Sequence, residues 1–223
     1  MQPGEKVSYQ GHQVCLFPMD YVYCTQVSGP GSFSHCCGHP ADWIGPSGNN
    51  PPGDPLYAPF DCTLVYSNGV EYGNCRAYSS DAPVWTPMGL TYVTVAFTHD
   101  WNPPTATHYS QGDLIYHTGD SGAAYGYHCH IDQSNAYGST LISYGYYCDP
   151  SLPWPCYALS DSQPPEDIFY LTGAETFVTD LGQNLQTWPF PPERSKASAI
   201  ILLAALKKKR GLYGRLKRNT GII

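Results

Sequence analysis

Alternation of apolar and polar side chains dominates the first 190 residues of the chain. The clearest run covers residues 89–98 and predicts one β-strand with two different faces. Sustained apolar spacing at 3.6 residues, which would indicate helices, is almost absent from the same region. The 22 glycines, 21 prolines and 19 tyrosines agree with many short strands joined by turns. We therefore predict a mainly β fold.

Smaller signals mark the other elements. Two short apolar pieces at 14–17 and 21–23 predict a strand or a lead-in, so residues 1–24 form an expected N-terminal segment. Residues 51–54 predict a turn, and a strand is expected to start within residues 56–66. Asn68-Gly69 then predicts a hairpin turn.

The C-terminal residues differ in character from the rest. Residues 195–209 contain the one convincing run of helix-forming residues. Its apolar part, residues 197–206, would span about 15 Å as a helix, roughly half of a bilayer core. We expect a short helical tail that does not cross a membrane, and no run in the chain reaches about 20 apolar residues.

Charge divides the chain at the same place. The formal net charge of -7 is the sum of two unlike regions. The body, residues 1–190, has seventeen acidic residues and only two basic ones, Lys6 and Arg76. The tail, residues 191–223, has nine basic residues and one acidic residue. Such a tail suits an anionic surface or wall polymer, an acidic partner, or packing within a larger particle. Nucleic acid is disfavoured as a partner because the acidic body would repel phosphates.

The N-terminus and the cysteines bear on the compartment. The first residues lack the apolar stretch of a secretory signal, so we expect synthesis in a cytoplasm without export by a visible signal. Nine cysteines are many for that compartment, and none forms a Cys-x-x-Cys pair, which argues against a zinc ribbon. A disulfide formed after release, with Cys148 and Cys156 as the candidates, is an open alternative.

Histidines gather at two places in the body. If residues 126–132 form a strand, His128 and His130 project from one face, as a compact pair for a metal or as one ligand beside an acid–base group. Upstream, a loop rich in Gly, Ser and Pro carries His35, His39 and Asp42, and is a candidate metal site or else a polar surface loop. His99 ends the alternating strand, where it faces either a cleft or solvent.

The order of these signals resembles the LytM/lysostaphin-like (M23) zinc endopeptidases, most closely those of phage tail and lysis proteins of Gram-positive hosts. Residues 56–61 resemble that group's YAPFD strand, and residues 111–119 resemble its G-D-x-I-Y hairpin. Residues 119–132 resemble its G-x-S-G…G-x-H-x-H-x-[DE] segment, and residues 164–170 its PEDxLF segment. The resemblance covers roughly residues 30–185. It implies an antiparallel β-sheet peptidase domain at 25–190, followed by the tail at 191–223.

The resemblance also implies roles for five residues. His35, Asp42 and His130 would hold Zn²⁺, while His99 and His128 would handle protons around the attacked carbonyl. His39, Cys36 and Cys37 are rival ligands, because His39-Pro40-Ala41-Asp42 is close to the family's shorter spacing and thiolates are soft ligands. The remaining histidines are interpreted as structural or surface groups: His12, His108 and His117.

These residues suit hydrolysis on general chemical grounds as well. Two imidazoles, one carboxylate and an open fourth position are what a catalytic zinc requires. We therefore expect a zinc endopeptidase that cuts bacterial peptidoglycan, encoded by a phage and carried in its tail or made for lysis. The alternatives are a degenerate structural tail protein that only binds cell wall and, less favoured, a secreted sugar-binding module. Phage tail proteins or an anionic surface are the expected partners of the tail at 191–223.

Overall fold

The structure is a computed structural model, and it describes residues 1–28, 35, 38–138, 161–178 and 185–189. Within these residues it is almost entirely β, which confirms the mainly β, antiparallel prediction. The elements are β1 (Ser8–Tyr9), β2 (His12–Gln13), β3 (Tyr21–Val22), β4 (Cys24–Val27), β5 (Ala41–Trp43), β6 (Pro55–Tyr57), β7 (Cys62–Ser67), η1 (Val70–Tyr72), β8 (Arg76–Ser80), β9 (Val84–Thr86), β10 (Gly89–Thr91), β11 (Thr94–Thr98), β12 (His108–Tyr109), β13 (Leu114–His117), β14 (Cys129–Ser134), α1 (Pro165–Ile168), β15 (Tyr170–Leu171), β16 (Thr176–Phe177) and β17 (Gln186–Thr187).

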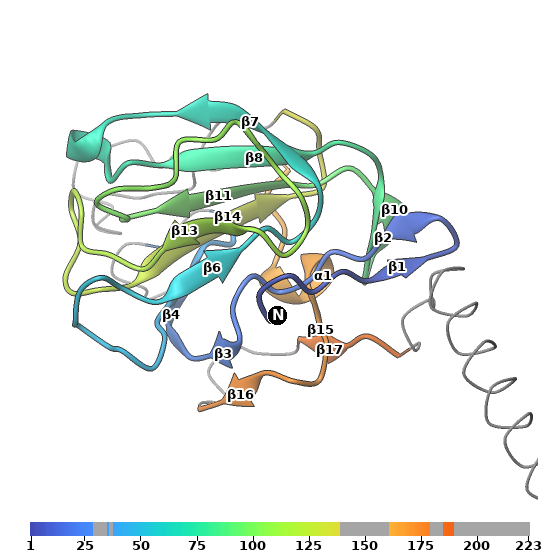
Figure 1. The fold of residues 1–223 in the computed structure, drawn as a ribbon, viewed down its shortest axis with the longest axis horizontal. Coiled ribbons are helices and arrows are strands. Elements are labelled where there is room, and N and C mark those ends of the chain that lie inside the picture. Colours follow the sequence, from blue (N-terminus) through green and yellow to red (C-terminus); the bar gives the residue numbers. More distant parts are fainter. Residues whose placement is uncertain (29–34, 36–37, 139–160, 179–184, 190–223) are drawn as a thin grey trace, which may run out of the picture. The chain divides into compact units, whose positions relative to one another are not determined.

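One seven-stranded antiparallel sheet forms the frame, in the order β12-β7-β8-β11-β14-β5-β4 (Figure 1). Because side chains alternate between faces, Trp43, Phe97 and Ile131 point together into the main apolar core, where each is at most 2% exposed. The opposite face carries the polar positions between them, including Asp42 and His130. Burial of one face fixes the register of the central strands.

The run at 89–98 is two strands, and its prediction as one strand is wrong. Residues 89–91 form β10, which pairs with β9, whereas residues 94–98 form β11, which pairs with β8 and β14. The alternation continues through Tyr92 and Val93, but the two halves take different partners. Local pattern predicts extended backbone, and pairing partners lie elsewhere in the chain.

The N-terminal segment contributes to the core. Met1, Val14, Leu16 and Phe17 are fully buried. The backbone of Phe17 donates to the carbonyl of Tyr170 at 2.8 Å, so this segment contacts the chain just after α1. The residues expected as a lead-in therefore pack as an integral part of the body.

The chain divides into two units, Met1–Phe190 and Pro191–Ile223, and every described residue belongs to the first. The expected tail helix, the pair Cys148 and Cys156, and the rival ligands Cys36 and Cys37 lie outside the described residues. Among the described residues, no helix has the length and apolarity needed to cross a membrane.

Candidate metal centre

Strand register brings the first two site residues together. Asp42 on β5 is the direct partner of His130 on β14, and His130 is in turn the partner of Thr98 on β11. Side chains of directly opposed residues in an antiparallel pair leave the sheet on the same face, about 5 Å apart. The loop that precedes β5 adds His35, whose side chain is 2% exposed.

The three side chains meet through one atom each. Nε2 of His35 and Nδ1 of His130 both lie 3.3 Å from Oδ1 of Asp42, and they are 3.1 Å from each other. The structure thus brings together all three residues for which a ligand role was predicted, in a buried cluster of two imidazoles and one carboxylate.

His128 lies at the edge of this cluster. Its Nε2 is 3.7 Å from Oδ1 of Asp42, and its Nδ1 is 2.8 Å from the carbonyl oxygen of Gly126. A carbonyl only accepts hydrogen bonds, so Nδ1 carries the proton and Nε2 of the neutral ring keeps its lone pair. Nε2, the ring nitrogen nearer to Asp42, can therefore accept a proton.

His99 completes the arrangement from the end of β11. Its ring lies against that of His128, with centroids 4.5 Å apart, and its Nδ1 is 2.8 Å from the carbonyl oxygen of Ser121. Because that carbonyl only accepts, Nδ1 carries the proton and Nε2 of neutral His99 is an acceptor. Nε2 must therefore take up a proton before it can donate one.

The backbone of His99 is held in an unusual conformation. Its φ of 93° is rare for a residue with a side chain. The amide donates to Gly73 at 2.7 Å and the carbonyl accepts from Ser121 at 3.0 Å. Gly119 packs so tightly here that a Cβ would come within 2.1 Å of the His99 oxygen. Gly73, Gly119 and the backbone of Ser121 therefore hold the backbone of His99 in place, and with it the direction of the imidazole.

Burial and neighbouring charges shift the pKa values in this cluster. Burial, followed by the nearby His128 and His130 rings, lowers the pKa of His99 to about 3. Burial also lowers the pKa of His35, against the opposing hydrogen bond to Asp42. Burial alone would raise the pKa of Asp42, but the close contacts with the His130 and His35 rings outweigh it and hold that pKa well below its usual range.

The donor set fits a zinc ion. Tetrahedral Zn²⁺ with bonds of about 2.0–2.2 Å places its ligand atoms roughly 3.3–3.6 Å apart, close to the 3.1 and 3.3 Å separations found between His35, Asp42 and His130. Two neutral imidazoles and a carboxylate are ligands that zinc prefers. The cluster is therefore compatible with zinc.

The other histidines lie apart from the cluster. His39 is exposed, and its backbone contacts Ser162 and Gln133 rather than the three ligand candidates. Two of the remaining histidines contact carboxylates, His108 with Asp81 at 2.7 Å and His117 with Asp100 at 3.1 Å, while His12 contacts a backbone carbonyl.

Sequence reasoning missed the surroundings of the two outer histidines. Asp100 and Trp101 directly follow His99 and line a cavity, together with His117 from β13. The adjacency of Asp100 and Trp101 to a predicted site residue was a usable signal. No comparable signal linked His117 to them.

The fold and the site thus define a mainly β protein with a buried His–Asp–His cluster that is compatible with zinc. No family model matches the chain. Over 125 residues it is 34% identical to "Morphogenesis protein 1" of Bacillus phage B103, an alignment that covers 55% of this chain and 32% of that protein. The chain therefore matches about a third of the length of this relative.

Two solved structures resemble part of the chain. One is a Pseudomonas aeruginosa protein assigned as a peptidase M23, with 18% identity, coverage of 60% of this chain and 48% of that one, and a TM-score of 0.35. The other is a zinc-containing peptidase from Vibrio cholerae, with 13% identity, coverage of 57% and 41%, and a TM-score of 0.34.

Proposed function

We propose that the chain is a zinc-dependent endopeptidase that cleaves peptide bonds of bacterial peptidoglycan. The observation that carries this proposal is the meeting of His35, Asp42 and His130 through single atoms, with His128 and His99 beside them. Zinc held by these three residues would lower the pKa of a bound water and polarise the scissile carbonyl.

The two outer histidines supply the proton chemistry. His128 accepts a proton through Nε2, because its Nδ1 is committed to the carbonyl of Gly126. The ring of His99 lies against His128 and is fixed by its own bond to Ser121. Once protonated, His99 donates to the developing oxyanion or to the leaving amine.

The substrate and setting are proposed on separate grounds. The ordered motifs between residues 30 and 185 resemble those of peptidoglycan endopeptidases from phage tails and lysis systems. The partial match to a phage protein named for morphogenesis supports a role in a virion, where a wall-cutting enzyme would act during entry. The basic tail at 191–223 is then proposed to bind an anionic wall surface or a neighbouring tail protein.

One observation favours an alternative. Nε2 of His128 lies only 3.7 Å from Oδ1 of Asp42, close enough for a small shift to make it a fourth ligand. A zinc with four protein ligands is structural and has no open position for substrate. In that case the chain would be a wall-binding structural protein of the virion.

Metal analysis tests the proposal directly. We expect the purified protein to hold about one zinc, to cleave purified Gram-positive wall, and to lose cleavage on chelation. His130→Ala should lose the ion, because removal of one of three ligands leaves a site that cannot compete with water and chelators. His39→Ala is the matched control, since His39 belongs to the same loop but not to the cluster. Zinc retained at full stoichiometry by His130→Ala would place the metal elsewhere.

A further inference from the structure

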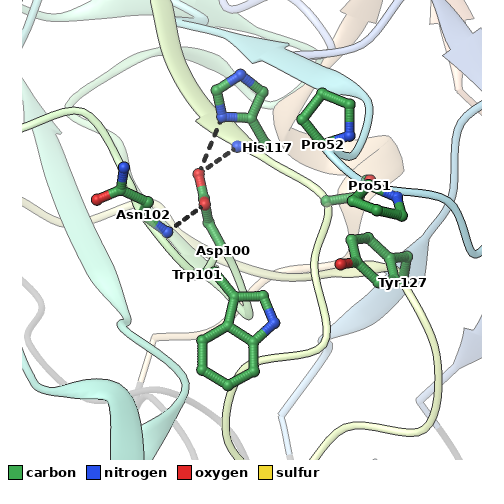
Figure 2. Close-up of a pocket in the computed structure, with 8 residues that line it drawn as sticks. Pro51, Pro52, Asp100, Trp101, Asn102, His117 and Tyr127 are labelled. Atoms are coloured by element: carbon green, nitrogen blue, oxygen red, sulfur yellow. Dashed lines mark hydrogen bonds and ion pairs between the residues drawn. The ribbon is translucent and has the colours of Figure 1, made fainter.

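A cavity of about 410 Å³ is lined by residues that adjoin the two outer histidines in the sequence (Figure 2). Asp100 and Trp101, which line it, directly follow His99 in the sequence, and Tyr127, which also lines it, directly precedes His128. Its walls also include Thr118, next to the glycine whose backbone pairs with His128. The complete lining is Pro51, Pro52, Asp100, Trp101, Asn102, His117, Thr118 and Tyr127. No role proposed so far uses this cavity.

A buried carboxylate forms its polar part. Asp100 is 5% exposed, and it accepts hydrogen bonds from the backbone of Asn102 at 2.7 Å and of His117 at 2.9 Å. It also accepts from Nδ1 of His117 at 3.1 Å, as drawn in Figure 2. Because a carboxylate only accepts, Nδ1 carries the proton and Nε2 of the neutral His117 ring remains an acceptor.

Two aromatic side chains, Trp101 and Tyr127, form the less polar part of the cavity wall. Trp101 is 54% exposed, and its Nε1–H donates to the carboxylate of Asp120, which fixes the indole in place. Tyr127 is held through its backbone amide, which donates to Asn49 at 2.8 Å. Both rings line the same cavity as Asp100 (Figure 2). Indole and phenol faces attract cations placed over them.

The charge around the cavity has one sign. Asp100 lines it and Asp120 holds one of its walls, whereas no lysine or arginine lines it. The whole body at 1–190 contains only two basic residues, Lys6 and Arg76. An anionic ligand would therefore meet a carboxylate without a compensating cation, and a purely apolar ligand would leave Asp100 facing it.

We infer that this cavity binds a primary ammonium group of the peptide substrate, next to the bond that is cut. The ammonium lies over the face of Trp101 and is balanced by the charge of Asp100. Its source is the side chain of a basic amino acid or the free amino terminus of a peptide. This inference rests on the proposed peptidase function and names the substrate group that positions the peptide.

A binding experiment on the metal-free full-length protein separates this inference from catalysis. Three probes are compared by ligand-detected NMR: Nα-acetyl-lysine amide, Nα,Nε-diacetyl-lysine amide, and glycinamide. The first carries only a side-chain ammonium, the second carries none, and the third carries only an α-ammonium. We expect the diacetylated probe to bind at least about tenfold more weakly than the first. Glycinamide binding as tightly as the first probe would assign the cavity to a peptide amino terminus.

Matched variants locate the binding. Trp101→Ala removes the exposed indole, and Asp100→Asn removes the charge while keeping the shape of the side chain. Both should weaken the lysine probe about tenfold, whereas Trp101→Phe should keep part of the binding. Tyr92→Ala, an aromatic residue that is 40% exposed and does not line the cavity, should bind like the wild type. Circular dichroism of each variant verifies that it is folded.

Hydrolysis supplies the second arm. Soluble wall peptides with free or acetylated side-chain amines should differ in KM, with kcat nearly unchanged, and Trp101→Ala should remove that difference. Equal affinity for all three probes overturns the inference, as does binding weaker than about 10 mM or full binding by Trp101→Ala. If the wild type binds the lysine probe but cleaves no wall peptide, the peptidase function fails instead.

Discussion

Protonation of His99 should destabilise the metal-free protein as the pH falls. The pKa of this imidazole is lowered to about 3 by burial and by its histidine neighbours, whereas an unfolded histidine titrates near 6.5. Between these values the unfolded chain binds more protons than the folded one, so stability decreases as the pH falls from about 6.5 towards 3. The native state thus excludes a proton that the unfolded state accepts.

The magnitude follows from the shift. At pH 4 the pH lies about 2.5 units below the pKa of the unfolded histidine, which is protonated, while the folded one is almost neutral. His99 should therefore lower the free energy of unfolding by about 3 kcal/mol relative to pH 7. His35, whose pKa is also lowered, adds a loss of the same sign. Asp42 contributes little down to this pH, because its stabilising effect is lost only as the pH falls below about 3.8.

Urea unfolding in the presence of a chelator, at pH 7 and at pH 4, measures the effect. Between the two pH values, the free energy of unfolding of His99→Asn should fall by about 3 kcal/mol less than that of the wild type. The contribution of His35 is present in both proteins and cancels in this difference. Asparagine is chosen because it tolerates positive φ better than most residues. Leu90→Ala, a surface change that removes no titrating group, should follow the wild type. Equal losses in His99→Asn and the wild type would refute the reasoning.

Two further predictions concern catalysis and the tail. His128→Ala should keep zinc but reduce turnover of purified wall by at least about 100-fold, the usual scale of lost general acid–base help; near-normal hydrolysis removes His128 from the mechanism, and loss of metal makes it a ligand. Deletion of 191–223 should leave cleavage of soluble wall peptides intact, because the proposed site lies between His35 and His130, while weakening attachment to whole walls, an effect that high salt should partly mimic. A truncated protein that fails to fold or to cleave soluble peptides would make the tail part of the domain core.

Local sequence pattern predicted the sheet and the facing of its histidines well. The spacing of His128 and His130 predicted that both project to one side, because strand side chains alternate with a period of two. The strand predicted at 126–132 begins only at Cys129, however, and His128 precedes it in an isolated bridge with Gly119. The same rule failed at 92–93, where the chain changes partners without changing its alternation. Alternation describes backbone conformation and burial, and strand partners depend on distant segments.

Two features of the site had no local signal. The positive φ of His99 depends on contacts with Gly73 and Ser121, which reach it from other parts of the chain. The hydrogen bond between His117 and Asp100 depends on where β13 lies relative to the end of β11. A histidine interpreted as structural from sequence thereby became part of the cavity wall. The roles of the five predicted site residues stay predictions until metal content and turnover are measured.

The pairing of β5 with β14 has a consequence for how this protein matures. His35 precedes His130 by 95 positions and Asp42 precedes it by 88, so the proposed ligand set cannot form before that long loop has closed. β5 contains only three residues, and a slip by one position would turn Asp42 towards the apolar core and aim Ala41 or Trp43 at the histidines. Zinc uptake would then mark the chains whose sheet closed in the correct alignment, and a misaligned molecule would be recognisable by its failure to take up the ion.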